Sequence, residues 1–381
     1  MIAVVKVLID GASVLTVDRG VSYISTGYLY IENGFIKSLG VGQASEELLY
    51  PELLLGGAGR LVTKGFASGF TVLSLYPLRY GLEDIDWFLM RELARAIKRA
   101  DMYFISLLSL AELASKGVTE VLVVDAYLDE VARASRDVGI NVTLAPPLNC
   151  GLDDQQQLNE LRLLLGRWHE RVEGVKIGIS VCRELKEDHV TLAKEASLPI
   201  YALELEKEPP KSAEKTKIVA VNPVLNMDFP AIYYGRMLRS WKGGGGVGIG
   251  IRPSYSVREV VKEILWSQNA DPADVFLSGT KTTSELISQQ ENSTLREGSR
   301  SSIVIYNLSE PPGWPLPRSL HSAIRAVLEG DAPIETVIVG DDIVLDREGI
   351  LTVGYELFKK AIKRFDELYP TLPPLISRQQ L

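Results

Sequence analysis

Cysteine and histidine are scarce in this chain, which contains two cysteines and three histidines among its 381 residues. The two cysteines, Cys150 and Cys182, are too few for a disulfide framework. Long apolar runs are missing as well, because no uninterrupted stretch approaches the roughly 18 apolar residues that a membrane span needs. The opening segment alternates like strands and lacks the basic start of a signal peptide. We therefore expect a cytoplasmic protein without a membrane partner.

Basic surface is also scarce, since 41 lysines and arginines stand against 49 acidic residues and give a net charge of −8. Binding to nucleic acid or to an anionic membrane needs a basic face or a run of lysines and arginines, and neither is visible. The one dense charge cluster, at 205–217, mixes both signs around two prolines and is typical of a solvated surface loop. The sequence therefore predicts no nucleic-acid partner.

Strand patterns are present at the start of the chain and then alternate with helical patterns. Residues 2–62 indicate short strands, with Asn33-Gly34 supplying the positive φ angles of a tight hairpin turn. The stretch 118–125 is apolar and rich in β-branched residues, as buried parallel strands are. Successive strand–helix units after residue 65 predict an α/β fold with a TIM-type (β/α)8 barrel. An open doubly wound sheet is the alternative.

Segments rich in strands flank this alternating part on both sides. Near residue 300 the pattern returns to strands. Because both flanks are β-rich and neither is large, we infer that they meet as one small β-sandwich. The predicted domains are a composite β-sandwich of residues 1–62 and 300–381, and a barrel of residues 63–299.

Several motifs resemble the amidohydrolase superfamily, specifically its cytosine-deaminase and chlorohydrolase-like branch. The stretch "GRLVTKGFASGFTV" (59–72) is similar to the first barrel strand of that family, whose usual form is G-R-hydrophobic-x-P-G-F-x-x-x-H-x-H. The other matching motifs are "LRYGLEDIDWF" (78–88), "AELASKGVTEVLVVD" (111–125), "VCRELKEDHVTLAKEASLPIYALELE" (181–206) and "LREGSRSSIVIYNL" (295–308). The resemblance covers nearly the whole chain and is weakest over 206–250.

This resemblance implies a barrel with a β-sandwich, and hydrolysis of C–N bonds in small cyclic or amine-bearing molecules. Such chemistry uses a divalent metal, such as zinc or iron, to lower the pKa of a bound water. It also needs acid–base groups that move the proton of that water.

The five positions that hold the metal ligands in this family carry other residues here. In chain order they correspond to Phe70, Val72, the vicinity of Leu203, Val221 or Asn222, and the vicinity of Arg252. The chain's own histidines lie elsewhere, at His169, His189 and His321. Because a metal ligand must offer a lone pair, we predict a protein without a metal cofactor.

Four other residues have both a functional and a structural interpretation. Glu206 corresponds to a family glutamate that contacts substrate or relays a proton, and it also suits a solvent-facing strand end. Arg252 is either a surface arginine or a replacement for the metal's positive charge, paired with Glu206 or with an anionic ligand. Cys150 and Cys182 follow successive strands, and without a nearby histidine to activate a thiol they favour buried small hydrophobes over nucleophiles.

Two further features favour structural roles. Arg79 matches a Leu-Arg landmark of the family that usually anchors a loop. The glycine run at 242–251 precedes a strand and does not open a helix, so it favours a flexible lead-in to that strand over a nucleotide-binding loop, and its second part, "GVGIGI" (246–251), favours close packing. The candidate pocket comprises Phe70, Val72, Arg79, Cys150, Cys182, Tyr201, Leu203, Glu206, Asn222 and Arg252.

The replaced ligands change the function that the resemblance implies. By descent the chain is a deaminase-like hydrolase of non-peptide C–N bonds, but we predict a metal-free protein that is inactive or has altered chemistry. One alternative is a pseudoenzyme that binds a small anionic or heterocyclic molecule. Another is a structural partner of an active paralogue. A small molecule is thus the expected partner, and self-association is left open.

Overall fold

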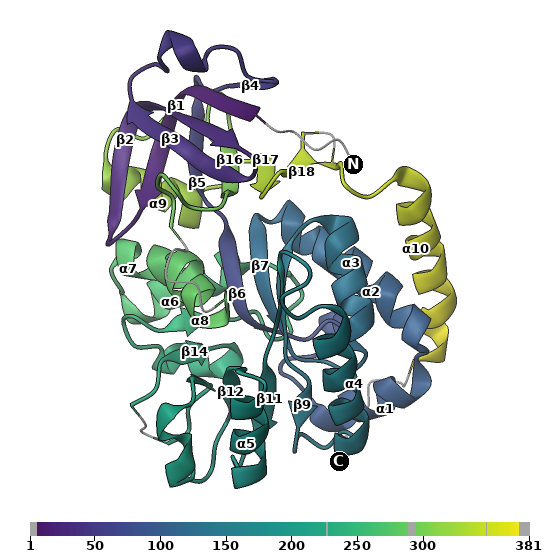
Figure 1. The fold of residues 1–381 in the computed structure, drawn as a ribbon. Helices are drawn as coiled ribbons and strands as arrows, with labels where there is room; N and C mark the ends of the chain where they lie inside the picture. The colour runs from purple at the N-terminus through teal and green to yellow at the C-terminus, as the bar shows by residue number, and fades with distance from the viewer. Residues whose placement is uncertain (1–5, 226–227, 289–293, 348, 373–381) are drawn as a thin grey trace.

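Figure 1 shows the fold in a computed structural model that describes residues 6–225, 228–288, 294–347 and 349–372. A mostly antiparallel sheet lies at one end of the molecule, and parallel strands with their helices form the remainder. Within these ranges no helix is both long and apolar enough to cross a membrane.

The mostly antiparallel sheet combines strands from both ends of the chain. Its order is β19-β18-β17-β16-β5-β1-β2-β3, and β4 pairs with β1. These strands are β1 (Lys6–Val17), β2 (Val21–Glu32), β3 (Phe35–Val41), β4 (Leu53–Gly56), β5 (Arg60–Lys64), β16 (Ser302–Asn307), β17 (Ile334–Val339), β18 (Asp342–Asp346) and β19 (Gly349–Ile350). Thr63 pairs with Val304, which joins the two ends. The predicted hairpin turn is confirmed, with φ angles of 49° at Asn33 and 72° at Gly34.

Parallel strands occupy the middle of the chain in two sheets, ordered β10-β8-β7-β6 and β15-β14-β13-β12-β11-β9. They are β6 (Phe66–Thr71), β7 (Val118–Val123), β8 (Asn141–Leu144), β9 (Pro147–Leu148), β10 (Val175–Ile177), β11 (Ile179–Cys182), β12 (Ile200–Leu203), β13 (Ile218–Val221), β14 (Ala231–Tyr233) and β15 (Gly246–Val247). Gly178, which separates β10 from β11, donates its N–H to the carbonyl of Leu144 in β8 at 3.0 Å, and Gly250, after β15, donates its N–H to the carbonyl of Phe70 in β6 at 2.8 Å. Hydrogen bonds thus connect the two sheets at both margins, and the predicted α/β class is confirmed.

Most of the helices cover the parallel strands from outside, whereas α9 (Leu320–Leu328) packs against β1 and β2 of the mostly antiparallel sheet. The other helices are α1 (Trp87–Ala96), α2 (Arg99–Ser115), α3 (Leu128–Val138), α4 (Asp154–Arg167), α5 (Glu187–Glu195), α6 (Val257–Gln268), α7 (Pro272–Leu277), α8 (Thr283–Ser288) and α10 (Tyr355–Leu368). Every residue of β6 and β7 is buried, as expected of parallel strands between helices. Helix α10, which was not predicted from the sequence, lies outside α2 (Figure 1).

The predicted close packing of the glycines in "GVGIGI" (246–251) is confirmed. A Cβ atom on Gly248 would lie 2.7 Å from the backbone nitrogen of Phe70, closer than such atoms can approach. Gly250 adopts a φ angle of 63°, which favours glycine, and its missing side chain leaves room for the ring of Tyr234. The segment after β15 can therefore lie directly against β6.

Candidate functional site

The residues at the five expected ligand positions lie at the carboxyl ends of the parallel strands. Phe70 is in β6 and Leu203 ends β12, while Val72 and Asn222 follow β6 and β13 directly. Arg252 follows the segment that bonds to β6 through Gly250. We call the surface formed by Phe70, Val72, Leu203, Asn222 and Arg252 the strand-end face. In folds built from parallel strands, this is the side that carries the functional site.

Aromatic packing fills the strand-end face. The rings of Phe70 and Tyr234 stack with centroids 4.4 Å apart and planes 22° from parallel, and both side chains are buried. The backbone N–H of Tyr234 donates to Oδ1 of Asn222 at 2.9 Å, and its hydroxyl donates to Oε1 of Glu204 at 3.2 Å. The hydroxyl of Tyr255 donates to the carbonyl of Val72 at 2.8 Å. Phe70 is therefore held by packing, and the polar groups beside it already have partners.

The residues at these positions do not fit a divalent metal. Phe70, Val72 and Leu203 have no lone pairs on their side chains, and Arg252 carries a positive charge. Asn222 has a suitable oxygen, but that oxygen accepts the hydrogen bond from Tyr234. Across the described ranges, no three histidine, cysteine, aspartate or glutamate side chains gather as a metal-binding group.

Tyr201 and Leu203 lie on the same strand but have different surroundings. The hydroxyl of Tyr201 donates to the carbonyl of Ile287 in α8 at 2.8 Å, and the hydroxyl of Thr143 donates to the same carbonyl at 2.9 Å. Leu203 pairs with Val221 across β12 and β13, and both are buried. Tyr201 is thus directed toward α8, and Leu203 packs at the strand-end face.

Asp125 is a buried acid beside the strand-end face and was not among the candidate residues predicted from the sequence. It follows β7, and its carboxylate accepts the backbone N–H groups of Leu73 at 2.9 Å and Ser74 at 2.7 Å. It also accepts the N–H of Ala126 at 2.8 Å. Burial raises the pKa of Asp125 to about 6, although these hydrogen bonds oppose the shift. An acid that ends a buried apolar strand was the signal in the sequence.

The raised pKa of Asp125 predicts a pH-dependent stability. In the unfolded chain an aspartate ionises near pH 4, whereas the folded state keeps its proton to about pH 6. The folded state therefore binds more protons between these values, and its stability falls as the pH rises from about 4 to 6. We expect the difference in unfolding free energy between the native protein and Asp125→Asn to fall over this range and to level off above pH 7. Urea titrations of both proteins measure it, and a flat difference would contradict the shift.

The predicted pairing of Arg252 with Glu206 is wrong. Nη2 of Arg252 lies 2.6 Å from Oε2 of Glu263 in α6, which is only eleven residues further along the chain. Glu206 is exposed, and its carboxylate lies 3.9 Å from Nε of Arg183. The helix that follows Arg252 supplies a nearby carboxylate, so its charge is already compensated. This pairing also makes Arg252 a poor site for an anionic ligand.

Cys150 and Cys182 form a disulfide, with an S–S distance of 2.05 Å and Cα atoms 5.0 Å apart. The prediction of two free cysteines, whether buried hydrophobes or nucleophiles, is therefore wrong. Leu148 of β9 pairs with Val181 of β11, so the two strands end side by side. The cysteines at these ends meet although 32 positions separate them in the sequence.

Arg79 anchors the loop after β6, as its family landmark suggested. Its guanidinium lies 3.9 Å from the ring centroid of Tyr76, and Nη2 lies 3.2 Å from the carboxylate of Glu112 in α2. Its Nε donates to the carbonyl of Pro253 at 2.9 Å. Arg79 thus ties the loop to α2 and to the segment that follows Arg252.

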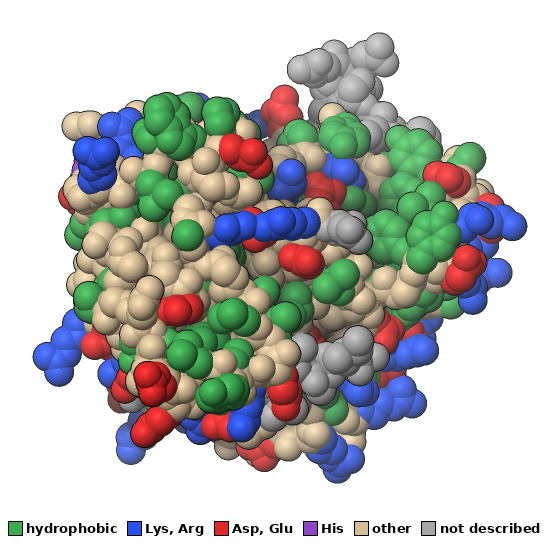
Figure 2. Space-filling model, turned by 90° about the horizontal axis from the view of Figure 1, so that it is seen from above, with side chains coloured by type: hydrophobic (Ala, Val, Ile, Leu, Met, Phe, Trp, Pro, Cys, Tyr) green, Lys and Arg blue, Asp and Glu red, His purple; other side chains and the backbone are tan. Residues whose placement is uncertain are grey.

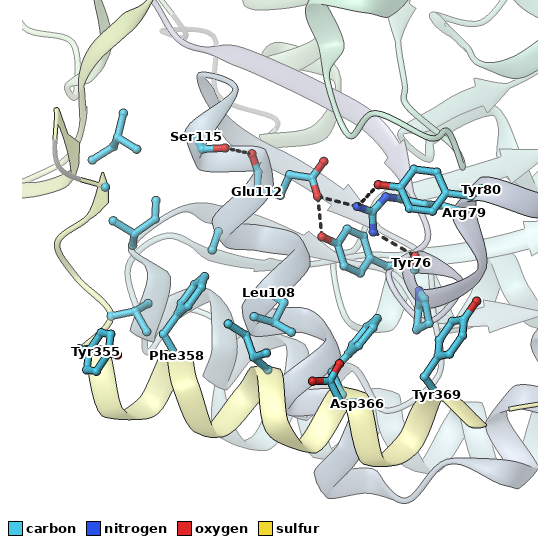
Figure 3. Close-up of a pocket in the computed structure, with 18 residues that line it drawn as sticks. Tyr76, Arg79, Tyr80, Leu108, Glu112, Ser115, Tyr355, Phe358, Asp366 and Tyr369 are labelled. Carbon is cyan, nitrogen blue, oxygen red and sulfur yellow. Dashed lines mark hydrogen bonds and ion pairs between the residues drawn. The ribbon is translucent and has the colours of Figure 1, made fainter. Parts of the chain in front are cut away.

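A cavity of about 940 Å³ lies away from the strand-end face, between α2, the turn at 76–81 and α10. Figure 3 shows its lining, with Arg79, Tyr76 and Glu112 bonded at one end and the side chains of α10 along one wall. Of the predicted pocket residues, Arg79 lines this cavity. The predicted candidate pocket and this cavity therefore share Arg79, whereas the other predicted pocket residues do not line the cavity.

Comparison of the sequence with protein-family models finds no match. A 5-methylthioadenosine/S-adenosylhomocysteine deaminase from Syntrophomonas wolfei is 29% identical over 175 residues, which are 44% of this chain and 40% of the relative. The deaminase of the same name from Thermoanaerobacter pseudethanolicus is 26% identical over 228 residues, 55% of this chain and 52% of the relative. The matches thus span about half, or less, of these two relatives. The deaminase of the same name from Caldanaerobacter subterraneus is 21% identical, over 87% of this chain and 93% of the relative.

Solved structures of similar fold match nearly the whole chain. A triazine hydrolase variant has a TM-score of 0.79 at 14% identity, over 96% of this chain and 99% of that chain. An adenosine deaminase from Xanthomonas campestris with bound zinc has a TM-score of 0.75 at 12% identity, over 96% and 98%. An amidohydrolase from a Sargasso Sea sample has a TM-score of 0.73 at 14% identity, over 96% and 99%. The sequence relatives and the solved structures of similar fold support the resemblance to the amidohydrolase superfamily that the sequence motifs indicated.

Proposed function

We propose that this chain is an amidohydrolase-superfamily protein that has lost metal-dependent catalysis at its strand-end face. The buried stack of Phe70 on Tyr234 is the observation that carries this proposal, because it occupies the place expected for the first metal ligands. Hydrolysis of a C–N bond needs an activated water, and a bound metal is the usual means of activation. The side chains present supply packing there instead of ligands.

Asp125 does not replace the missing chemistry. Its raised pKa suits an acid–base group near neutral pH. However, the carboxylate is fully buried, and both of its oxygens accept backbone hydrogen bonds. A general base must reach the proton that it abstracts, directly or through one water. Asp125 therefore fits a structural role in holding the loop after β6.

A deaminase-type hydrolase is the second candidate, and the names of the sequence relatives favour it. Under this alternative, the chain would release ammonia from an adenine-bearing molecule of the kind those names specify. The residues of the strand-end face provide no catalytic groups for this deamination, so the activity would need catalytic groups from another part of the chain.

An ammonia-release assay combined with metal analysis separates the two candidates. The assay uses 5-methylthioadenosine, S-adenosylhomocysteine and 5′-deoxyadenosine, with the purified chain as prepared and after addition of zinc, iron or manganese. We expect no release above the enzyme-free control and much less than one equivalent of bound metal. Turnover together with stoichiometric metal would overturn the proposal and establish the deaminase.

The finer architecture is also a proposal. We propose that the parallel strands close into one (β/α)8 barrel spanning residues 63–299, with 1–62 and 300–381 as a composite β-sandwich domain. The hydrogen bonds that Gly178 and Gly250 make at the margins between the two parallel sheets support closure. A cytoplasmic location without nucleic-acid or membrane partners stays a prediction. The Cys150–Cys182 disulfide weighs against that location in cells whose cytoplasm is reducing.

A further inference from the structure

The cavity beside α10 exists because one face of this helix is left uncovered. Five side chains that recur at helical spacing line the cavity, and we call them the aromatic stripe: Tyr355, Phe358, Ile362, Phe365 and Tyr369. Three of them stay exposed within the described chain: Tyr355 by 76%, Ile362 by 45% and Tyr369 by 54%. Figure 2 shows hydrophobic side chains gathered at the right of the upper face, where α10 begins. An apolar stripe on a helix normally packs against the protein, so this one suits an additional partner.

Helix α10 is attached to the molecule by residues that lie next to this stripe on the helix surface. Ala361 and Leu368 are buried, and Arg364 forms an ion pair of 2.7 Å with Asp101 near the start of α2. These contacts hold the helix in place while the aromatic stripe faces α2 across the cavity (Figure 3). The helices that form the walls of the cavity are therefore held in fixed positions.

The polar groups at one end of the cavity already have hydrogen-bond and ion-pair partners, so they do not favour binding of an anion. Arg79 donates to the carbonyls of Pro253 and Tyr76 and to the hydroxyl of Tyr80, and it pairs with Glu112. The hydroxyl of Tyr76 donates to the same carboxylate. A ligand carboxylate or phosphate would have to break these contacts to reach Arg79.

Asp366 is the charged residue of the cavity lining that remains besides Arg79 and Glu112. Its exposed side chain lines the cavity and has no hydrogen-bond or ion-pair partner among the described residues. Because the charges of Arg79 and Glu112 cancel, Asp366 leaves the lining with one net negative charge. The neighbouring rings of Phe365 and Tyr369 stack with centroids 6.3 Å apart. A carboxylate beside aromatic rings attracts a cation.

We propose that the cavity between α2 and α10 binds an elongated apolar molecule that carries a protonated amine. The apolar body lies along the aromatic stripe, which extends for about 20 Å from Tyr355 to Tyr369 at the rise of an α-helix. The amine lies at Asp366, beside Phe365 and Tyr369. A volume of about 940 Å³ is in the upper range of small-molecule sites. The proposal is independent of whether the strand-end face is catalytic.

Calorimetric titration of the full chain tests this proposal with three probes that differ only in their head group: decylamine, decan-1-ol and decanoate, each below its aggregation concentration. We expect one decylamine per chain, with weaker binding of the alcohol and weakest binding of the carboxylate. Asp366→Asn should lower the affinity for decylamine about three- to tenfold and leave that for decan-1-ol unchanged. Glu356→Gln is the matched control, since it removes the same charge from the same helix outside the cavity lining.

A second variant tests the location of the apolar body. Ile362→Trp places a larger side chain in the cavity from a half-exposed position, so it should weaken all three probes without unfolding the protein. Circular dichroism checks the fold. Equal binding of amine and alcohol, or affinities that neither variant changes, would overturn the proposal. Self-association that Ile362→Trp abolishes, without any probe binding, would identify a second copy as the occupant and also overturn it.

Discussion

Replacing Phe70 with alanine should lower the free energy of unfolding by about 3–5 kcal/mol, the usual cost of removing a fully buried aromatic side chain. Phe70 has no exposed surface and stacks on Tyr234 with centroids 4.4 Å apart. Gly248 packs closely against Phe70 and Gly250 donates a hydrogen bond to it, so the backbone around Phe70 is fixed. The neighbouring side chains therefore have little freedom to fill the space that the missing ring would leave. Chemical denaturation measures the loss.

The outcome for Phe70 distinguishes a packed strand-end face from a functional pocket. Residues in functional sites are often replaced with little loss of stability, because such sites hold strain or unfilled space. A loss below about 1 kcal/mol would therefore contradict the packing role. Phe35→Ala is the matched control: its ring is partly exposed on β3, and we expect a smaller loss there. A larger loss for Phe35 than for Phe70 would also contradict the interpretation.

Local patterns in the sequence predicted those parts of the fold that local physics decides. The β-branched run at 118–125 became β7, and Asn33-Gly34 formed its turn, because each depends on residues adjacent in the chain. Helix α10 has an equally local pattern in "YELFKKAIKRF", with apolar residues at Tyr355, Phe358 and Ile362. It was missed because the terminal segment was interpreted as strands throughout.

Contacts between distant residues could not be predicted in the same way. Which carboxylate pairs with Arg252 depends on where α6 starts, and Glu263 proved nearer than Glu206. The disulfide depends on β9 and β11 being neighbours, which only the assembled sheet decides. The cavity beside α10 likewise depends on how far that helix stands from α2. The positions of the strand-end residues were predictable through family resemblance, whereas their packing required the structure.

Removing the Cys150–Cys182 disulfide should lower the free energy of unfolding by about 3–4 kcal/mol. In the chain-entropy description, the bond restricts the unfolded state by closing a loop, and a separation of 32 residues corresponds to a loss of this size. The double variant Cys150→Ser/Cys182→Ser removes the bond while keeping small side chains at both strand ends. Urea denaturation with and without a thiol reductant measures the effect.

The reductant provides the internal control for this prediction. It should destabilise the native protein to about the level of the double variant, and it should leave the double variant unchanged because no bond remains to be reduced. Both cysteines lie at strand ends beside the strand-end face, and the pairing of β9 with β11 remains in either case. The fold should therefore persist, with an unchanged circular dichroism spectrum. If the native protein and the double variant unfold at the same urea concentration without reductant, the bond does not stabilise the chain as the loop length predicts.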